Sequence, residues 1–419
     1  MKILFHPKKY IDFIITVDTT KAGSASNHFI LPTTGAGYDC VVRWGDGTTS
    51  RHTGTPGNID HKYATSGTYQ IKIRGKFPRI FFNNTGDKLK LISIDQWGNV
   101  VWDSMGQAFY GCANMTGNYT DLPNVTSVTE MSYMFAGCSK FNSSVSFNTS
   151  AVTTMAYMFS GCSVFNKTVS SFNTSKVKST SAMFNGCSAF NQSVSNFDTA
   201  LVTNMSYMFQ GCKYFNQSLS NFNTEKVKNM GYMFNVCDVF NQSVSNFNTS
   251  LVTNMESMFS NCKAFNQSVS NFNTANVTNM SQMFRDSTAF NQSVSNFITS
   301  KVTNISSMFS GCTSLAGVDI SGWDLSLVTG TNSTQNTFSN CSIFQSLTLP
   351  ASLSRVDDKF AQYCSAITNY YIYRSTAPTV SGTPFDNYAK PLHVPVGATG
   401  YDVTPWTNTA IFSSVTADL

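Results

Sequence analysis

The chain has 419 residues, and only 12% of them are charged, about half the usual share. The net charge of +5 is spread thinly, without a block of basic residues, which argues against a nucleic-acid-binding surface. No run of about 18 apolar residues occurs, so we expect no segment that inserts into a membrane.

The first twenty residues do not have the pattern of a secretion signal. They are basic and partly apolar, but Pro7, Lys8 and Asp12 interrupt the apolar run that a signal needs. We expect no signal peptide or anchor, and we interpret residues 10–17 as the first strand. The surface rich in Ser, Thr, Asn and Gln is nevertheless common on extracellular proteins and virion surfaces. Such a location requires release by lysis, another export route, or assembly into a particle.

Residues 1–85 are predicted to form a small β-sandwich. Short runs rich in β-forming residues alternate with turns rich in Gly, Asn and Thr, which is typical of all-β domains. The runs are 10–17, 28–31, 39–44 and 68–73. Because Asp46 lies between two glycines that favour a tight turn, we interpret it as a turn residue, not a catalytic or metal-binding carboxylate.

The order WGDG, HxY, GxYxIxIxG between Trp44 and Gly75 resembles the polycystic-kidney-disease (PKD) type of immunoglobulin-like domain. The resemblance covers about 35 residues. It implies a spacer or adhesion module without catalytic activity, and it makes the N-terminal domain the expected contact for a homo-oligomer or an assembly partner.

Residues 86–344 are predicted to form a solenoid, because a cysteine column recurs every 25 residues. The column contains Cys162, Cys187, Cys212, Cys237, Cys262, then Ser287 and Cys312. A fixed period of this length indicates stacked coils, each of which buries its apolar side chains against its neighbours. In the repeat 202–224, the apolar residues of 202–209 have the spacing of one face of a helical or 3₁₀ turn. Residues 216–220 read as a short strand with Leu219 inward.

Two residue columns of the repeat allow a structural or a functional interpretation. We expect the cysteines to be reduced and buried, although a disulfide between neighbouring coils is geometrically conceivable. A metal site is disfavoured, since there is no Cys-x-x-Cys pair and no His in the repeats. The recurring asparagines are expected to form an inner hydrogen-bonded ladder instead of a row of sugar-binding amides. They are Asn142, Asn166, Asn191, Asn216, Asn241, Asn266 and Asn291.

The repeat VTNMSYMFQGCKYFNQSLSNFNT at 202–224 is similar to the repeats of BspA-like surface proteins, leucine-rich-repeat relatives found on bacteria, mycoplasmas and some protists. Phe222-Asn223-Thr224 stands where many of those repeats have Trp and Asp. The resemblance implies adhesion or recognition at a surface, without a shared catalytic site. Residues 345–419 resemble a diverged terminal repeat followed by a cap.

No catalytic constellation is visible in the sequence. All five histidines lie outside the repeats, and no phosphate loop, nucleophile elbow or zinc motif is present. We therefore expect no enzyme, no cofactor and no metal, and an enzyme acting on polysaccharide is the least favoured function.

A binding surface is the favoured site. Lysines recur at a doubled period of 50 residues, and several tyrosines lie nearby. The candidates are Lys176, Lys178, Lys213, Lys226, Lys228, Lys263, Tyr207, Tyr214 and Tyr232. The lysines are either solvated remnants of a two-coil duplication or a stripe facing an acidic glycan, and the tyrosines either stack on sugars or form half-buried edges.

Two functions follow. The first is an adhesion or recognition protein that presents its solenoid to a surface protein or glycan, as a virion fibre or adhesin. The alternative is a structural subunit of a multimeric virion, appendage or filament that has no ligand of its own.

Overall fold

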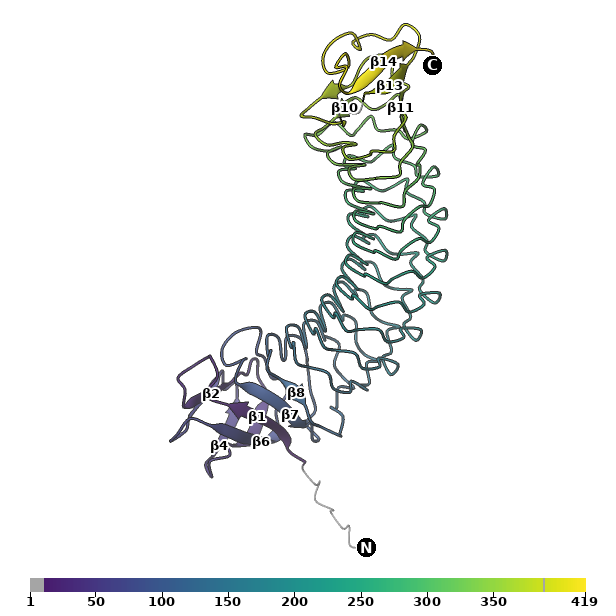
Figure 1. Ribbon diagram of the computed structural model, residues 1–419. Helices are drawn as coiled ribbons and strands as arrows, with labels where there is room; N and C mark the ends of the chain where they lie inside the picture. Colours follow the sequence, from purple (N-terminus) through teal and green to yellow (C-terminus); the bar gives the residue numbers. More distant parts are fainter. Residues whose placement is uncertain (1–10, 387–388) are drawn as a thin grey trace. The chain divides into compact units, whose positions relative to one another are not determined.

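The computed structural model describes residues 11–386 and 389–419. They fall into two compact units, Met1–Phe197 and Asp198–Leu419. No helix occurs among the described residues, and both units contain stacked coils, which confirms the predicted class, mainly β with a solenoid (Figure 1).

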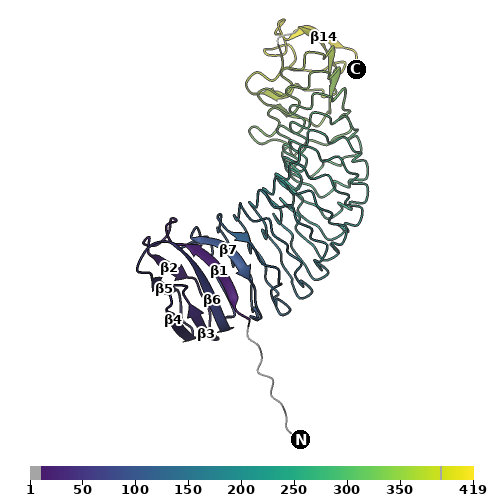
Figure 2. The ribbon, with the colours of Figure 1, turned by 60° about the horizontal axis from the view of Figure 1, so that its bottom comes forward.

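The first unit begins with two sheets, shown in Figure 2, whose strands pair antiparallel except for the last pair of the larger sheet. The larger sheet has the order β4 (Thr49–Gly54), β3 (Tyr38–Arg43), β6 (Thr68–Lys76), β1 (Phe13–Asp18), β7 (Leu91–Gln96), β8 (Thr116–Gly117). The smaller sheet pairs β2 (His28–Leu31) with β5 (Ile59–Lys62). The strands predicted at 28–31, 39–44 and 68–73 are confirmed within a few residues. The first strand begins at Phe13. The predicted start at residue 10 lies outside the described residues, as does the first half of the segment judged for a signal.

The larger sheet continues from the sandwich into the first coils. Strand β1 pairs with β6 on one side and with β7 on the other, and β7 then pairs in parallel with β8. The predicted boundary at residue 85 therefore falls between strands of one sheet, and the division into three domains stays a prediction.

A buried ion pair strengthens this connection. The side chains of Asp87 and Lys90 are both inaccessible to solvent and lie 3.5 Å apart. Lys90 Nζ donates to the carbonyl oxygens of Ser24, Ala25 and His28, while Asp87 accepts from the backbone amide of Ser24 at 2.6 Å. A buried charge pair is tolerated only with such additional hydrogen bonds, so the pair fixes the 24–28 loop onto the first coil.

The coils are built from consecutive turns. Met208 donates its backbone N–H to Met205 O, and Cys212 donates to Phe209 O, three residues back in each case. The third residue of each turn, Tyr207 or Gly211, has a positive φ of 61° or 72°. Turns of type II have this conformation.

The intervening amides bond along the stack. In the second unit, Tyr207 N donates to Gly231 O at 3.0 Å, and Phe209 N donates to Met233 O at 3.0 Å. The prediction of a helical turn for 202–209 is therefore wrong. A spacing of three residues is common to helices and to consecutive turns. The two structures differ in the residues with a positive φ, which occur only in the turns.

The predicted strand at 216–220 is also wrong, because the structure has no strand there, although Leu219 is buried as expected. Side chains replace the strand ladder in this part of the coil. Asn216 Oδ1, for example, accepts from the backbone amide of Asn241 at 2.9 Å.

Apolar side chains fill the interior of each unit in columns. Phe234 is fully buried, and its ring lies 5.9 Å from that of Phe209 and 5.5 Å from that of Phe259. The stacked rings run parallel within about 9°. Such offset stacking adds to the free energy gained from burial.

The C-terminal part of the second unit, drawn in green and yellow in Figure 1, has regular parallel strands. The sheet has the order β14 (Phe412–Ala417), β13 (Lys390–Val394), β11 (Asn369–Ile372), β9 (Ser346–Leu349). A second parallel pair joins β10 (Arg355–Val356) to β12 (Thr379–Val380). Strand β14 is an outer strand of the four-stranded sheet, and five of its six residues are exposed.

Candidate binding surface

The cysteine column lies in the interior of the coils, where its thiols are not reactive. All eleven cysteines lie within the described residues, and each is buried and free of disulfide bonds. Burial raises the pKa of the Cys237 thiol well above its ordinary value, and only the thiolate is reactive. The expected reduced, buried column is what the structure shows.

The same column also contributes hydrogen bonds, which the sequence did not indicate. Cys237 Sγ lies 3.0 Å from Phe209 O of the preceding coil, a carbonyl that also accepts from the amide of Cys212. Ser287 donates in the same way to Phe259 O at 2.5 Å. Serine is therefore accepted at this position because its hydroxyl replaces the thiol as donor.

The asparagine column forms a ladder, as predicted. Asn241 Oδ1 accepts from the backbone amide of Asn266 at 3.0 Å and from Gln267 Nε2 at 3.1 Å. The same contact links Asn142 to Asn166 in the first unit. The expectation of an inner position is wrong, however, since Asn166 and Asn266 are exposed. The ladder lies at the surface, and its amide oxygens are engaged between the coils.

A second, buried ladder uses the threonine that ends each repeat. Thr274 is inaccessible to solvent, donates to Ile298 O at 2.9 Å and accepts from Ile298 N at 2.7 Å. The hydroxyl thus satisfies both the N–H and the C=O of Ile298 in the next coil, as a neighbouring strand would do in a sheet. Its column was visible in the sequence, but its double role was not.

The candidate lysines lie in different parts of the coils. Lys176 and Lys178 belong to the first unit, and the other four belong to the second. Lys213 and Lys263 share one exposed column, but Asp238 lies between them in that column, and its Oδ1 is 3.0 Å from Lys263 Nζ. An acidic residue therefore interrupts the positive stripe in this column.

Lys226 and Lys228 lie together on a different turn of one coil, and both are exposed. They have two cationic groups on adjacent outward positions. A role of any of the six lysines in binding stays a prediction.

The candidate tyrosines have two different environments. Tyr207 and Tyr232 are half-buried, with rings stacked 4.6 Å apart at 7°. Tyr232 donates its phenol to Glu256 Oε1 at 2.6 Å, and burial, aided by this carboxylate, raises the pKa of Tyr232 to about 12. Tyr214 is 63% exposed, so it is the tyrosine of the three whose ring is open to a ligand.

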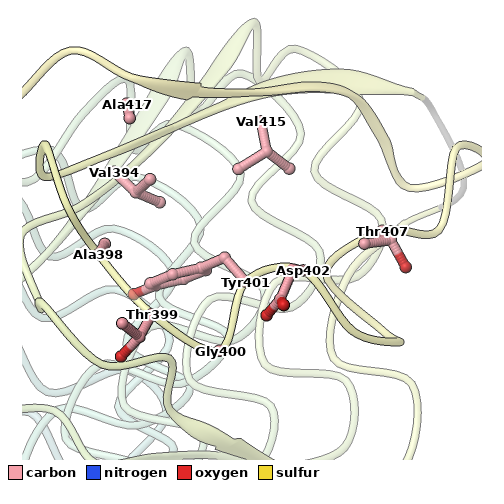
Figure 3. A pocket seen from close by; sticks show the side chains of 9 residues that line it. All are labelled: Val394, Ala398, Thr399, Gly400, Tyr401, Asp402, Thr407, Val415 and Ala417. Carbon is pink, nitrogen blue, oxygen red and sulfur yellow. The ribbon is translucent and has the colours of Figure 1, made fainter.

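A hollow of about 510 Å³ lies in the C-terminal part of the second unit (Figure 3). Val394 and Val415 line its strand side, and the ring of Tyr401 lies across from them. Tyr401 donates its hydroxyl to Arg374 O at 3.0 Å, and burial raises the pKa of Tyr401 to about 12. Asp402 is the charged residue of the lining. With its phenol engaged and one carboxylate, the hollow offers an apolar contact surface without an acid-base pair.

Among residues 11–386 and 389–419, no three His, Cys, Asp or Glu side chains lie close enough together to hold a metal ion. In the same part of the chain there is no helix with the length and apolarity needed to cross a bilayer. What the described surface presents is rows of neutral amides and hydroxyls, interrupted by single charges and aromatic rings.

These features define a repeat protein of stacked coils closed at one end by parallel strands. The chain belongs to the DUF285 family, described as Mycoplasma protein of unknown function, whose sequence model matches residues 103–200, 168–251, 191–277 and 239–350. The overlapping matches follow the internal repeats and confirm the prediction of a repeat protein.

Two solved structures are similar to the chain at low identity. A leucine-rich repeat protein from Bacteroides ovatus is 15% identical over 76% of this chain and 88% of that chain, with a TM-score of 0.38. A leucine rich cell surface protein from Faecalibacterium prausnitzii is 14% identical over 68% of this chain and 83% of that chain, with a TM-score of 0.28. No curated protein matches the chain.

Proposed function

We propose that this protein is a non-enzymatic recognition protein that acts outside a cell or on a virion, where the sides of its coils bind a surface protein or glycan. The resemblance of the repeats to BspA-like proteins implies the adhesive role. The resemblance of Trp44–Gly75 to PKD domains supports an attachment or spacer role for the sandwich.

The observation that carries the proposal is a contrast between inward and outward columns of the second unit. The inward phenylalanine is the same in five successive coils: Phe209, Phe234, Phe259, Phe284 and Phe309. Four residues later, an outward column reads Lys213, Asp238, Lys263, Thr288 and Thr313, of which all but the half-exposed Asp238 are exposed. A constant scaffold with variable outward positions is the arrangement by which repeat proteins recognise partners.

A glycan array probed with the full chain tests this function. We expect saturable binding to one class of sugar, weakened when Tyr214 is replaced by serine or when Lys226 and Lys228 are both replaced by glutamine. Lys301→Gln is the matched control, because Lys301 occupies the column of Lys226 three coils later and donates to Asn276 Oδ1. Equal binding by all variants would contradict recognition through these residues. An array without any signal would contradict a glycan as the ligand.

A second candidate function is that of a structural subunit, and β14 is the feature that favours it. This outer strand, FSSVTA, is exposed and lacks the charged residues that usually protect a sheet edge from pairing. Sedimentation velocity over a range of concentrations tests the assembly. Self-association that Val415→Lys abolishes would support the subunit, and a monomer at all concentrations would contradict it.

A further inference from the structure

The larger sheet of the first unit carries a small basic hollow on its outer face. Buried and half-exposed residues alternate along β3 and β6, so Arg43 and Lys72 lie on the face opposite to the core. The hollow has a volume of about 240 Å³. Its lining consists of Arg43, Gly45, Gly47, Thr48, Thr49, Gln70 and Lys72.

The two cations of this hollow are direct cross-strand partners. Arg43 on β3 is paired in register with Lys72 on β6. Like charges directly opposite each other destabilise a sheet. Without a ligand, this pair therefore adds nothing to the stability of the sheet. The backbone of Lys72 is paired in the sheet, but its ammonium group makes no ion pair or hydrogen bond with any of the described residues.

Nearby acidic groups leave an excess of positive charge. Asp12 is the carboxylate that contacts Arg43, at 3.1 Å, and it also accepts from Arg74 Nε at 2.6 Å. One negative charge is thus shared between two guanidinium groups. Asp95 accepts from the hydroxyls of Thr16 and Ser93 at 2.6 Å in each case.

The turn between β3 and β4 forms the wall of the hollow. Gly45 has a φ of +88°, and a Cβ there would lie 2.6 Å from Gln70 O, so only glycine lets the turn approach β6 this closely. The carboxylate of Asp46 accepts from Thr48 and His61. The acidic residue of the turn is therefore committed to contacts within the turn and with β5.

We propose that this hollow binds the sulfate or phosphate group of an anionic sugar. Arginine and lysine side chains bind oxyanions through charge-assisted hydrogen bonds. The hydroxyl of Thr49, which lines the same hollow, matches a hydroxyl of the attached sugar, while Gln70 Nε2 donates to Asp95 Oδ2 at 3.4 Å. The site belongs to the sandwich, so it goes beyond the proposed recognition by the coils and does not depend on it.

Saturation-transfer NMR on the full chain tests the site with three probes: glucosamine 6-sulfate, glucosamine 6-phosphate and glucosamine. We expect at least one charged sugar to bind and the neutral sugar to give no signal. The stronger of the two charged probes identifies the source of the oxyanion.

Lys72→Gln is the decisive variant, and Lys62→Gln, an exposed lysine on β5, is its control with the same loss of charge. We expect Lys72→Gln to weaken binding about tenfold or more, while Lys62→Gln binds like the unmodified chain. The melting temperature of Lys72→Gln should be unchanged or higher, because the substitution removes the like-charged pair. Absence of binding by both charged sugars, or equal binding by Lys72→Gln, would overturn the proposal.

Discussion

The N-terminal sandwich and the coils satisfy their backbone hydrogen bonds in different ways. In the sandwich, ladders between strands pair the backbone groups, as between β1 and β6. In the coils, alternate amides bond within a turn or along the stack, and side chains such as Thr274 and Asn241 supply further rungs. A coil made of turns therefore depends on the identity of particular polar residues, whereas a strand ladder tolerates almost any side chain.

The two regions also differ in what they bury. The first unit buries the charged pair Asp87 and Lys90 where the sandwich meets the first coil. Between residues 131 and 304, the polar side chains buried in the described coils are all neutral hydroxyls. Removing a charge partner from the first region should therefore cost more than removing a neutral rung from the second.

Lys90→Met has the largest expected effect, a loss of about 3–5 kcal/mol in the free energy of unfolding, because it leaves Asp87 buried without its cation. Urea unfolding followed by intrinsic fluorescence measures this loss. Lys88→Met is the control, since Lys88 lies in the same segment and is half-exposed. If both variants unfolded at the same urea concentration, the buried pair would not be what joins the sandwich to the coil.

Thr274→Val comes next, with an expected loss of about 2 kcal/mol. Valine has the shape of threonine but leaves the amide and carbonyl of Ile298 without their partner. Thr274→Ser keeps the hydroxyl and should retain most of the stability. A serine variant as unstable as the valine variant would show that the methyl group matters, not the rung.

Cys237→Ala should cost about 1 kcal/mol, the net contribution of one hydrogen bond. Cys237→Ser should be closer to the unmodified chain, because serine already donates at position 287. Both are compared by urea unfolding. On the unmodified chain, a thiol reagent should react with Cys237 only after unfolding, since burial raises the pKa of this thiol. Rapid reaction under native conditions would contradict the dry interior.

The columns of the coil were predictable because the period alone shows which residues stack. The fixed positions of Phe, Met and Cys therefore identified the core. The conformation of the coil was not predictable, because the same spacing of three suits a helix and a series of turns, and Tyr207 gives no sign that it adopts a positive φ of 61°.

The sites depend on information that the repeat period does not contain. Arg43 and Lys72 become neighbours only through the register of β3 and β6, which the sequence does not specify over a separation of almost thirty residues. The interruption of the lysine column by Asp238 was visible in the sequence, but the contact with Lys263 required the structure.

Asp46→Asn tests the turn of the sandwich through pH. Burial alone would raise the pKa of Asp46, but hydrogen bonds from Thr48 and His61 lower it to about 2, from an ordinary value of 3.8. A carboxyl whose pKa is lower in the folded chain contributes stability above pH 4, and this contribution is lost as the pH falls toward 2. The difference in unfolding free energy between the unmodified chain and Asp46→Asn should therefore be largest near pH 5 and shrink toward pH 2. Acid titrations of urea unfolding measure it, and a difference that grew on acidification would contradict the role of this carboxylate in the turn.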